Sequence, residues 1–253
     1  IIMITISIIG SGKLSYNLSE AFISNKEFRL NEIYSRNYKN IKLFNKKIKF
    51  TNKIENISEA DFYFILTNDD SIAEISKKIK TKNGMILHSS GTQGKDALSN
   101  HSNFGVFYPL QTFSFNKKID FTRTPILIEG NSEKSLEKLK KLCQVLELEF
   151  EEVDKKKRLR YHLAALFANN FTNHILSLTD ELINKFKLKK KFFIPIANET
   201  FKKFQSNKSK ESQTGPAVRN DLKTLKKHEE ILKKSNYLNL YKIITKSIKK
   251  NDL

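Results

Sequence analysis

The chain opens, over residues 2–15, with IMITISIIGSGKLS. The run of isoleucines predicts a buried strand over residues 2–9. Leu14, Leu18 and Phe22 then recur at the spacing of one helical face over residues 13–24. A glycine-rich turn that follows a strand and begins a helix is typical of the first βα unit of a doubly wound sheet. This stretch therefore decides the predicted fold class.

Strands and helices continue to alternate over the first half of the chain. We expect strands over residues 31–35, 48–51, 61–67, 84–88, 105–108, 125–129 and 149–153, and helices over 70–80 and 132–146. This alternation predicts an α/β fold of the Rossmann type, with a doubly wound, mostly parallel sheet covered by helices on both faces.

The pattern becomes wholly helical after Asp154. Residues 156–186 contain no Gly or Pro, and further helices are expected over 191–203, 221–234 and 238–249. We therefore predict a dinucleotide-binding domain at 1–154 and an all-α domain at 155–253. The basic run at 155–158, which ends at Arg158, is interpreted as the solvated start of the long helix.

The turn after the first strand carries the prediction of a cofactor. Gly10 permits the tight turn, Gly12 lets the backbone approach a pyrophosphate, and Ser15 is small enough for the third position of the motif. The following helix presents unpaired N–H groups to phosphates. The alternative is an ordinary glycine-rich turn. The expected cofactor-binding residues of this turn are Gly10, Ser11, Gly12, Lys13 and Leu14.

The end of the second strand helps to choose the cofactor. An NAD site usually carries Asp or Glu there, whereas this chain has Ser35-Arg36. A hydroxyl and a guanidinium suit a 2′-phosphate, so we predict NADP rather than NAD, with an unliganded surface arginine as the alternative. Thr67 and Asn68 end the fourth strand and are also expected to bind the cofactor, while Asp70 is expected to cap the next helix.

Two further strand ends are expected near the reacting end of the cofactor. In the segment HSSG at 88–91, we assign His88 to the cofactor, Ser89 to the substrate and Ser90 to catalysis. Gln111 and Thr112, which follow the next strand, are candidate substrate ligands. The alternative interpretation is a polar turn at the strand end for the first segment and a proline-directed turn for the second.

A polar stripe marks the long helix. His162, Asn169 and Asn173 are separated by seven and four residues, so they share one face of an otherwise apolar helix. We predict that His162 and Asn169 are catalytic and that Asn173 binds substrate. Asn170, turned about 80° from His162, is a further catalytic candidate. Imidazole suits proton transfer because it changes charge near neutral pH; the alternative is a hydrogen-bonded core histidine.

A loop marked by Gly and Pro, TGPAVRND at 214–221, interrupts the helical half. Thr214 and Arg219 are candidate substrate ligands, with Arg219 directed at an anionic group, and Asp221 is expected to cap the following helix. The alternatives are a structural connector and an ion pair between Arg219 and a carboxylate.

Composition limits the remaining choices. The net charge is +19, but only six of the 46 basic residues are Arg and the lysines are spread along the chain, which favours compositional drift over a nucleic-acid surface.

The single Cys143 excludes an intramolecular disulfide and a multi-thiolate site, and we expect no metal. The longest apolar run is too short to span a bilayer and lacks a signal-peptide pattern. We therefore expect a cytoplasmic protein without a membrane partner.

Five segments together resemble a known family: GSG at 10–12, HSSG at 88–91, YPLQTF at 108–113, YHLAA with FANN at 161–170, and TGPAVRND at 214–221. The family consists of bacterial Rossmann-like proteins whose helical C-terminal domain has no assigned function. It is related to deazaflavin-dependent NADP reductases, pyrroline-5-carboxylate reductases and the 6-phosphogluconate dehydrogenase superfamily.

The resemblance implies that the helical domain closes the nicotinamide cleft, and it implies a homodimer. Many relatives carry His at the position of Tyr108. The dehydrogenases of the superfamily often use a helix Lys and Asn as a catalytic pair, whereas this chain has His162 with Asn169 or Asn170.

The sequence thus predicts an NADP-dependent oxidoreductase that acts on a small polar metabolite. His162 would exchange the proton, Asn169 would orient the substrate carbonyl or imine, and Arg219 would bind an anionic group. Two alternatives stay open: a dinucleotide-binding sensor without turnover, and a nucleic-acid binder.

Overall fold

A computed structural model describes residues 3–37, 40–116, 119–206 and 211–250 of the chain. The chain divides into two compact units, one up to Ile175 and the other from Leu176 onward. This division lies later than the predicted domain boundary at Asp154. The helix that begins at Lys155 starts within the first unit, because Arg158 near its start pairs with Glu129 of the sheet. The predicted strand began at Ile2, which lies outside the described residues.

The first unit contains a sheet whose described strands run in the order β3-β2-β1-β4-β5-β6-β7-β8. Neighbouring strands are parallel except for β6 and β7. The predicted α/β class and its mostly parallel sheet are therefore confirmed. The strands are β1 (Ile4–Ile9), β2 (Phe28–Tyr34), β3 (Phe50–Thr51), β4 (Phe62–Ile65), β5 (Met85–His88), β6 (Phe104–Pro109), β7 (Ile126–Gly130) and β8 (Phe150–Glu152).

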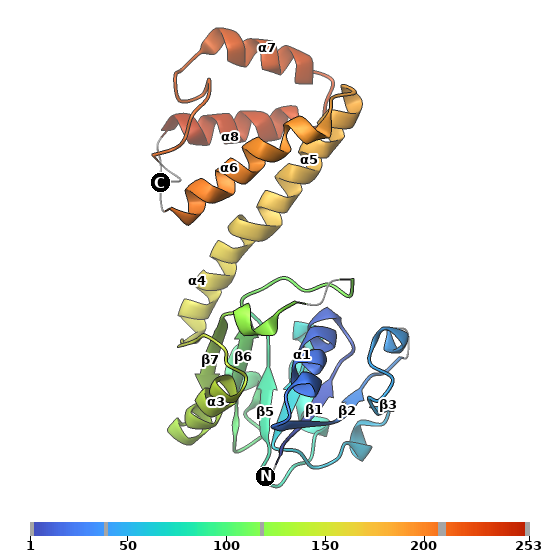
Figure 1. Ribbon diagram of the computed structural model, residues 1–253. Helices are drawn as coiled ribbons and strands as arrows, with labels where there is room; N and C mark the ends of the chain where they lie inside the picture. Colours follow the sequence, from blue (N-terminus) through green and yellow to red (C-terminus); the bar gives the residue numbers. More distant parts are fainter. Residues whose placement is uncertain (1–2, 38–39, 117–118, 207–210, 251–253) are drawn as a thin grey trace. The chain divides into compact units, whose positions relative to one another are not determined.

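Helices cover both faces of this sheet (Figure 1). α1 (Lys13–Ser24) and α3 (Glu133–Val145) lie on one face, and α2 (Ile72–Lys78) packs on the other. α2 follows a short 3₁₀ turn, Asp69–Ser71, and no side chain caps it. The predicted capping role of Asp70 is therefore wrong, because the 3₁₀ turn places Ser71 at the cap position.

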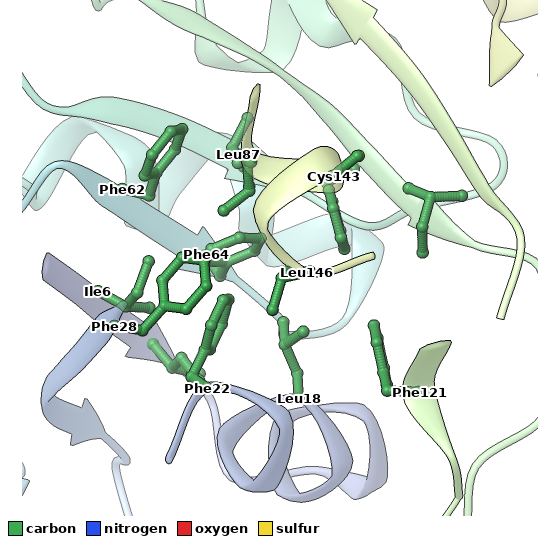
Figure 2. Close-up of a cluster of buried hydrophobic side chains, with 14 of the residues drawn as sticks. Ile6, Leu18, Phe22, Phe28, Phe62, Phe64, Leu87, Phe121, Cys143 and Leu146 are labelled. Atoms are coloured by element: carbon green, nitrogen blue, oxygen red, sulfur yellow. The ribbon is translucent and has the colours of Figure 1, made fainter. Parts of the chain in front are cut away.

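The larger core lies between the sheet and the helices α1 and α3 (Figure 2). Phe22 of α1 packs on Phe64 of β4, with ring centroids 5.4 Å apart, and Phe64 packs edge-on against Phe107 of β6 at 5.4 Å. Cys143 of α3 is fully buried in the same cluster, and burial raises the pKa of its thiol to about 12. Cys143 therefore behaves as a small apolar residue.

The remaining helices follow β8. α4 (Lys155–Ala165) continues through a π-helical segment, Leu166–Phe171, into α5 (Thr172–Lys185). The second unit adds α6 (Ile194–Gln205), α7 (Leu222–Leu232) and α8 (Leu238–Lys250). Asp221 caps α7 by accepting a hydrogen bond from the Thr224 amide, so its predicted capping role is confirmed.

Candidate functional site

Four loops leave the same edge of the sheet because β1, β4, β5 and β6 are parallel. These loops follow Ile9, Ile65, His88 and Pro109. Ligands of open α/β sheets bind at this carboxyl edge. The fold therefore brings most of the predicted cofactor and substrate residues of the first unit to one edge, although they are far apart in the sequence.

The two glycines of the first loop have different surroundings. Gly10 has φ +119°, and a Cβ atom there would lie 2.4 Å from the carbonyl oxygen of Leu66. Gly12 is exposed, and a Cβ atom there would meet nothing within 4 Å. Gly12 also begins α1 without a side-chain cap. Since the first N–H groups of a helix lack intrahelical partners, this open end has the features of a phosphate cradle.

The first loop is tied to the end of β2. The hydroxyls of Ser11 and Ser35 lie 2.7 Å apart, and Ser35 donates to the Asn37 carbonyl at 2.6 Å. The side-chain amide of Asn40 donates to the Ser11 carbonyl at 3.2 Å. Ser35 is thus buried and engaged, whereas Arg36 is exposed. Beyond the glycines and Ser11, Lys13 is exposed and Leu14 packs against the core.

The loop after β4 contributes one residue that sequence reasoning missed. Thr67 and Asn68 lie in this loop, where Ser71 donates to the Thr67 hydroxyl at 2.9 Å and to the Asn68 carbonyl at 2.7 Å. Asp69 accepts hydrogen bonds from Ser90 at 2.6 Å and from Thr92 at 2.8 Å. An acidic residue at a strand end was visible in the sequence, but its partners in the loop after β5 were not.

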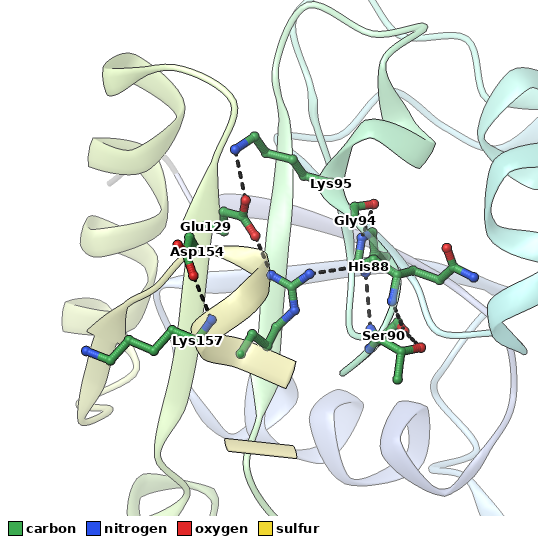
Figure 3. Close-up of polar contacts among 10 residues, drawn as sticks. His88, Ser90, Gly94, Lys95, Glu129, Asp154 and Lys157 are labelled. Atoms are coloured by element: carbon green, nitrogen blue, oxygen red, sulfur yellow. Dashed lines mark hydrogen bonds and ion pairs between the residues drawn. The ribbon is translucent and has the colours of Figure 1, made fainter. Parts of the chain in front are cut away.

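His88 and its neighbours form a buried polar turn (Figure 3). The Nδ1 atom of His88 accepts from the Ser90 amide at 3.1 Å, which leaves Nε2–H to donate to the Gly94 carbonyl at 3.2 Å. Burial lowers the pKa of His88 to about 4, so the ring is neutral near pH 7. Ser89 donates to the Phe107 carbonyl at 2.6 Å. These side chains are engaged within the protein.

We expect His88 to make folding stability depend on pH. The pKa of its imidazole is about 4 in the folded chain and about 6.5 when unfolded. Between these values the unfolded chain binds a proton that the folded chain does not, so stability is full above the higher value and falls as pH drops. The loss reaches about 2–3 kcal/mol near pH 4.5.

Urea unfolding at neutral and acid pH measures this loss. The acid-induced drop should be about 2 kcal/mol smaller in His88→Asn than in wild type. The exposed His174 supplies the control, and His174→Asn should keep the full drop. An equal drop in all three proteins would contradict the assignment.

Arg158 belongs to the first turn of α4, but its side chain does not lie in solvent. Its side chain is fully buried, pairs with Glu129 of β7 and donates to the Gln93 carbonyl. Lys95 also pairs with Glu129, at 2.8 Å (Figure 3). The interpretation of 155–158 as a wholly solvated run is therefore wrong at Arg158, because a carboxylate on the neighbouring strand holds the guanidinium inside.

His162 lies on the next turn of α4 and faces the carboxyl edge of the sheet. Its Nδ1 atom lies 2.9 Å from the phenolic oxygen of Tyr108. A Cβ atom on Gly91 would lie 2.7 Å from the same Nδ1, so the imidazole rests directly on the backbone of this loop. The structure thus joins three of the sequence segments, at 88–91, 108–113 and 161–170.

The predicted asparagines lie further along the same continuous helix. Asn169 and Asn170 belong to the π-helical segment, and the side-chain nitrogen of Asn169 donates to the side-chain oxygen of Asn170 at 3.3 Å. Asn169, Asn170 and Asn173 are exposed. Single π turns inside α-helices occur frequently at functional sites.

The other predicted substrate residues are exposed as well. Gln111 and Thr112 follow β6, where the Gln111 side chain accepts from the Thr112 amide at 2.8 Å. Thr214 and Arg219 belong to the second unit, in the loop before α7. Their roles stay predictions.

Among the described residues, no group of three or more His, Cys, Asp or Glu side chains is placed to hold a metal ion. Within the same ranges, no helix combines the length and apolar character that a bilayer crossing requires.

A family model described as a domain of unknown function, DUF2520, matches residues 124–248. The structure is similar to that of a Bacteroides fragilis protein described as a "putative NADP oxidoreductase", with 31% identity, a TM-score of 0.90 and 98% of each chain covered.

More distant structures share the fold. A Thermotoga maritima protein has 18% identity and a TM-score of 0.71 over 97% of each chain. The pyrroline carboxylate reductase of Plasmodium falciparum, solved with NADP bound, has 12% identity and a TM-score of 0.63, with 97% of this chain and 98% of that chain covered. No curated protein matches the sequence.

Proposed function

Because this chain belongs to the family of Rossmann-like NAD(P)-binding proteins with a helical C-terminal DUF2520 domain, we propose that it is an NADP-dependent oxidoreductase acting on a small polar metabolite. One observation carries the proposal. At the carboxyl edge of β1, Gly10 turns the chain at φ +119°, and the exposed Gly12 leaves the N-terminus of α1 accessible. This arrangement fits a pyrophosphate.

The cofactor residues follow from this fit. The backbone of Gly10, Ser11 and Gly12 would hold the pyrophosphate with the first turn of α1, which carries Lys13 and Leu14. Thr67 and Asn68 would border the cofactor from the neighbouring loop. The exposed Arg36 would bind a 2′-phosphate, since no carboxylate follows β2 to bind ribose hydroxyls in its place. When bound, the nicotinamide would supply or accept a hydride.

The protein's own groups would handle the substrate and the proton. His162, in contact with Tyr108, would supply or accept the proton of the reaction, and Asn169 or Asn170 would orient a carbonyl or imine. Ser89 and Ser90 donate their protons within the protein, and both ring nitrogens of His88 form hydrogen bonds. In place of the direct cofactor, substrate and catalytic roles predicted from the sequence, these three residues would hold the shape of the loop at the site. Gln111, Thr112, Asn173, Thr214 and Arg219 remain proposed substrate ligands, Arg219 for an anionic group.

A homodimer is part of the proposal. Apolar side chains on α4, the π segment and α5 recur at intervals of four residues and are exposed, and a second copy of the chain would cover them. They are Leu159, Leu163, Phe167, Phe171 and Ile175.

Titration of the chain with NADPH and NADH tests the cofactor assignment. Wild type should bind NADPH more tightly, and Arg36→Ala should weaken NADPH binding by about 10–100-fold, because a charge-assisted hydrogen bond contributes about 1.5–3 kcal/mol. NADH binding should change little. Nucleotide fluorescence gives the affinities.

The exposed Arg29, near the start of β2, provides a matched control. Arg29→Ala also removes one positive charge, so it corrects for the overall field of the protein. Equal affinity for both nucleotides in wild type and Arg36→Ala would contradict the choice of NADP. With the preferred nucleotide known, a metabolite screen that follows absorbance of the reduced cofactor would identify the substrate.

A further inference from the structure

Tyr108 lies at this edge in contact with His162, and the proposed function leaves it without a task. It is the penultimate residue of β6, and its side chain is half-buried. Because Phe107 points into the core beneath α1 and α3, the alternation of a strand directs Tyr108 to the opposite face. There its hydroxyl meets Nδ1 of His162 at 2.9 Å.

The side chains of residues 88–90, which follow β5 beside Tyr108, are engaged in other hydrogen bonds. Both ring nitrogens of His88 bond to the backbone, Ser90 donates to Asp69, and Ser89 donates to the Phe107 carbonyl. Using any of these protons would break a bond that shapes the loops. Tyr108 and His162 instead bond to each other, and each keeps part of its surface exposed.

The position of His162 is fixed from two sides. The Gly91 backbone supports its imidazole so closely that a Cβ atom at residue 91 would lie 2.7 Å from Nδ1. The buried Arg158, one turn earlier on α4, anchors the helix to Glu129 and to the Gln93 carbonyl. The imidazole is therefore held against the phenol by packing and by the anchored helix.

Burial keeps the phenol of Tyr108 protonated. Burial raises the pKa of Tyr108 above its ordinary value; the nearby Arg158 guanidinium lowers it, and the Asp69 carboxylate raises it. A phenol that holds its proton near neutral pH can donate it to a developing negative charge.

We propose that Tyr108 is the residue that exchanges the proton with the substrate and that His162 exchanges protons with Tyr108; this inference rests on the proposed function. In the reducing direction, the substrate carbon gains a hydride whose source is the reduced nicotinamide cofactor. The phenolic O–H bond breaks, and its proton forms a bond to the carbonyl oxygen or imine nitrogen. The phenolate then takes the Nδ1 proton of His162 while Nε2 of the same ring takes a proton from hydronium in the solvent, so the imidazole changes tautomer without a change of charge. The net transfer is one proton from solvent to the substrate. Oxidation reverses each transfer.

Two substitutions at Tyr108 test this assignment in the full-length chain. With the substrate found by the screen, Tyr108→Phe should lower kcat by about 100-fold or more, because it removes the transferable proton. Tyr108→His, which restores a proton-transfer group, should stay within about tenfold of wild type. Both variants should bind NADPH as wild type does. Tyr161, half-buried on α4 and bonded to Glu151, gives the matched control Tyr161→Phe, which should retain full kcat.

A second measurement does not depend on turnover. In a chain labelled with ¹⁵N in its histidine rings, Tyr108→Phe should shift the ring signals of His162, and Tyr161→Phe should not. His162→Gln identifies these signals by their loss. Tyr108→Phe with kcat within about threefold of wild type, or with unchanged His162 signals, would overturn the inference and leave the oxidoreductase assignment standing. A wild-type chain that neither binds nor oxidises NADPH would overturn both.

Discussion

Replacing Arg158 by methionine is expected to lower the free energy of unfolding by about 3 kcal/mol, the lower end of the range for a broken buried ion pair. The guanidinium is fully buried and pairs with Glu129, whose side chain is 10% exposed. Its loss leaves that carboxylate with Lys95, which is partly in solvent, and removes a donor from the Gln93 carbonyl. Urea unfolding at neutral pH measures the loss.

The double variant Glu129→Met/Arg158→Met separates the cost of an unpaired charge from the cost of lost packing. Apolar replacement of both partners is often neutral, so the double variant should regain at least half of the loss. Arg160, exposed on the same helix, supplies the control. Arg160→Met should change stability by less than about 0.5 kcal/mol. If Arg158→Met behaved like Arg160→Met, the pair would be shown to contribute little.

Arg158 also shows where sequence reasoning fails. A run of four basic residues at a helix start is ordinarily exposed, and three of them are exposed here. The fourth is buried because β7 places Glu129 beneath it. No local pattern encodes this pairing, since Glu129 of β7 lies 29 residues earlier in the chain.

The elements that sequence did predict are those with local causes. Apolar runs bounded by turns located the strands, and the Gly10–Gly12 turn was interpretable because strand, turn and helix are consecutive in the chain. His88 illustrates the limit of such reasoning. Its place at a strand end was predicted correctly, but its two backbone partners come from the loop that follows, whose conformation was not predictable.

Gly10 and Gly12 have different surroundings, so the same substitution should affect stability differently at the two positions. Gly10→Ala is expected to destabilise the fold by about 3 kcal/mol, because alanine is strained at φ +119° and its Cβ would overlap the Leu66 carbonyl. Gly12→Ala should change stability by less than about 1 kcal/mol, because the new methyl group meets only open space.

The two variants should lose cofactor binding for different reasons. In Gly12→Ala, a methyl group would stand where the backbone must approach the pyrophosphate, so NADPH affinity should fall by at least about tenfold in a protein that is still folded. In Gly10→Ala, any loss of binding should follow the loss of folded protein, and thermal unfolding recorded beside each titration distinguishes the two causes. If Gly12→Ala bound NADPH as wild type does, the open space at Gly12 would not be the phosphate cradle, and the cofactor would have to bind elsewhere on the sheet edge.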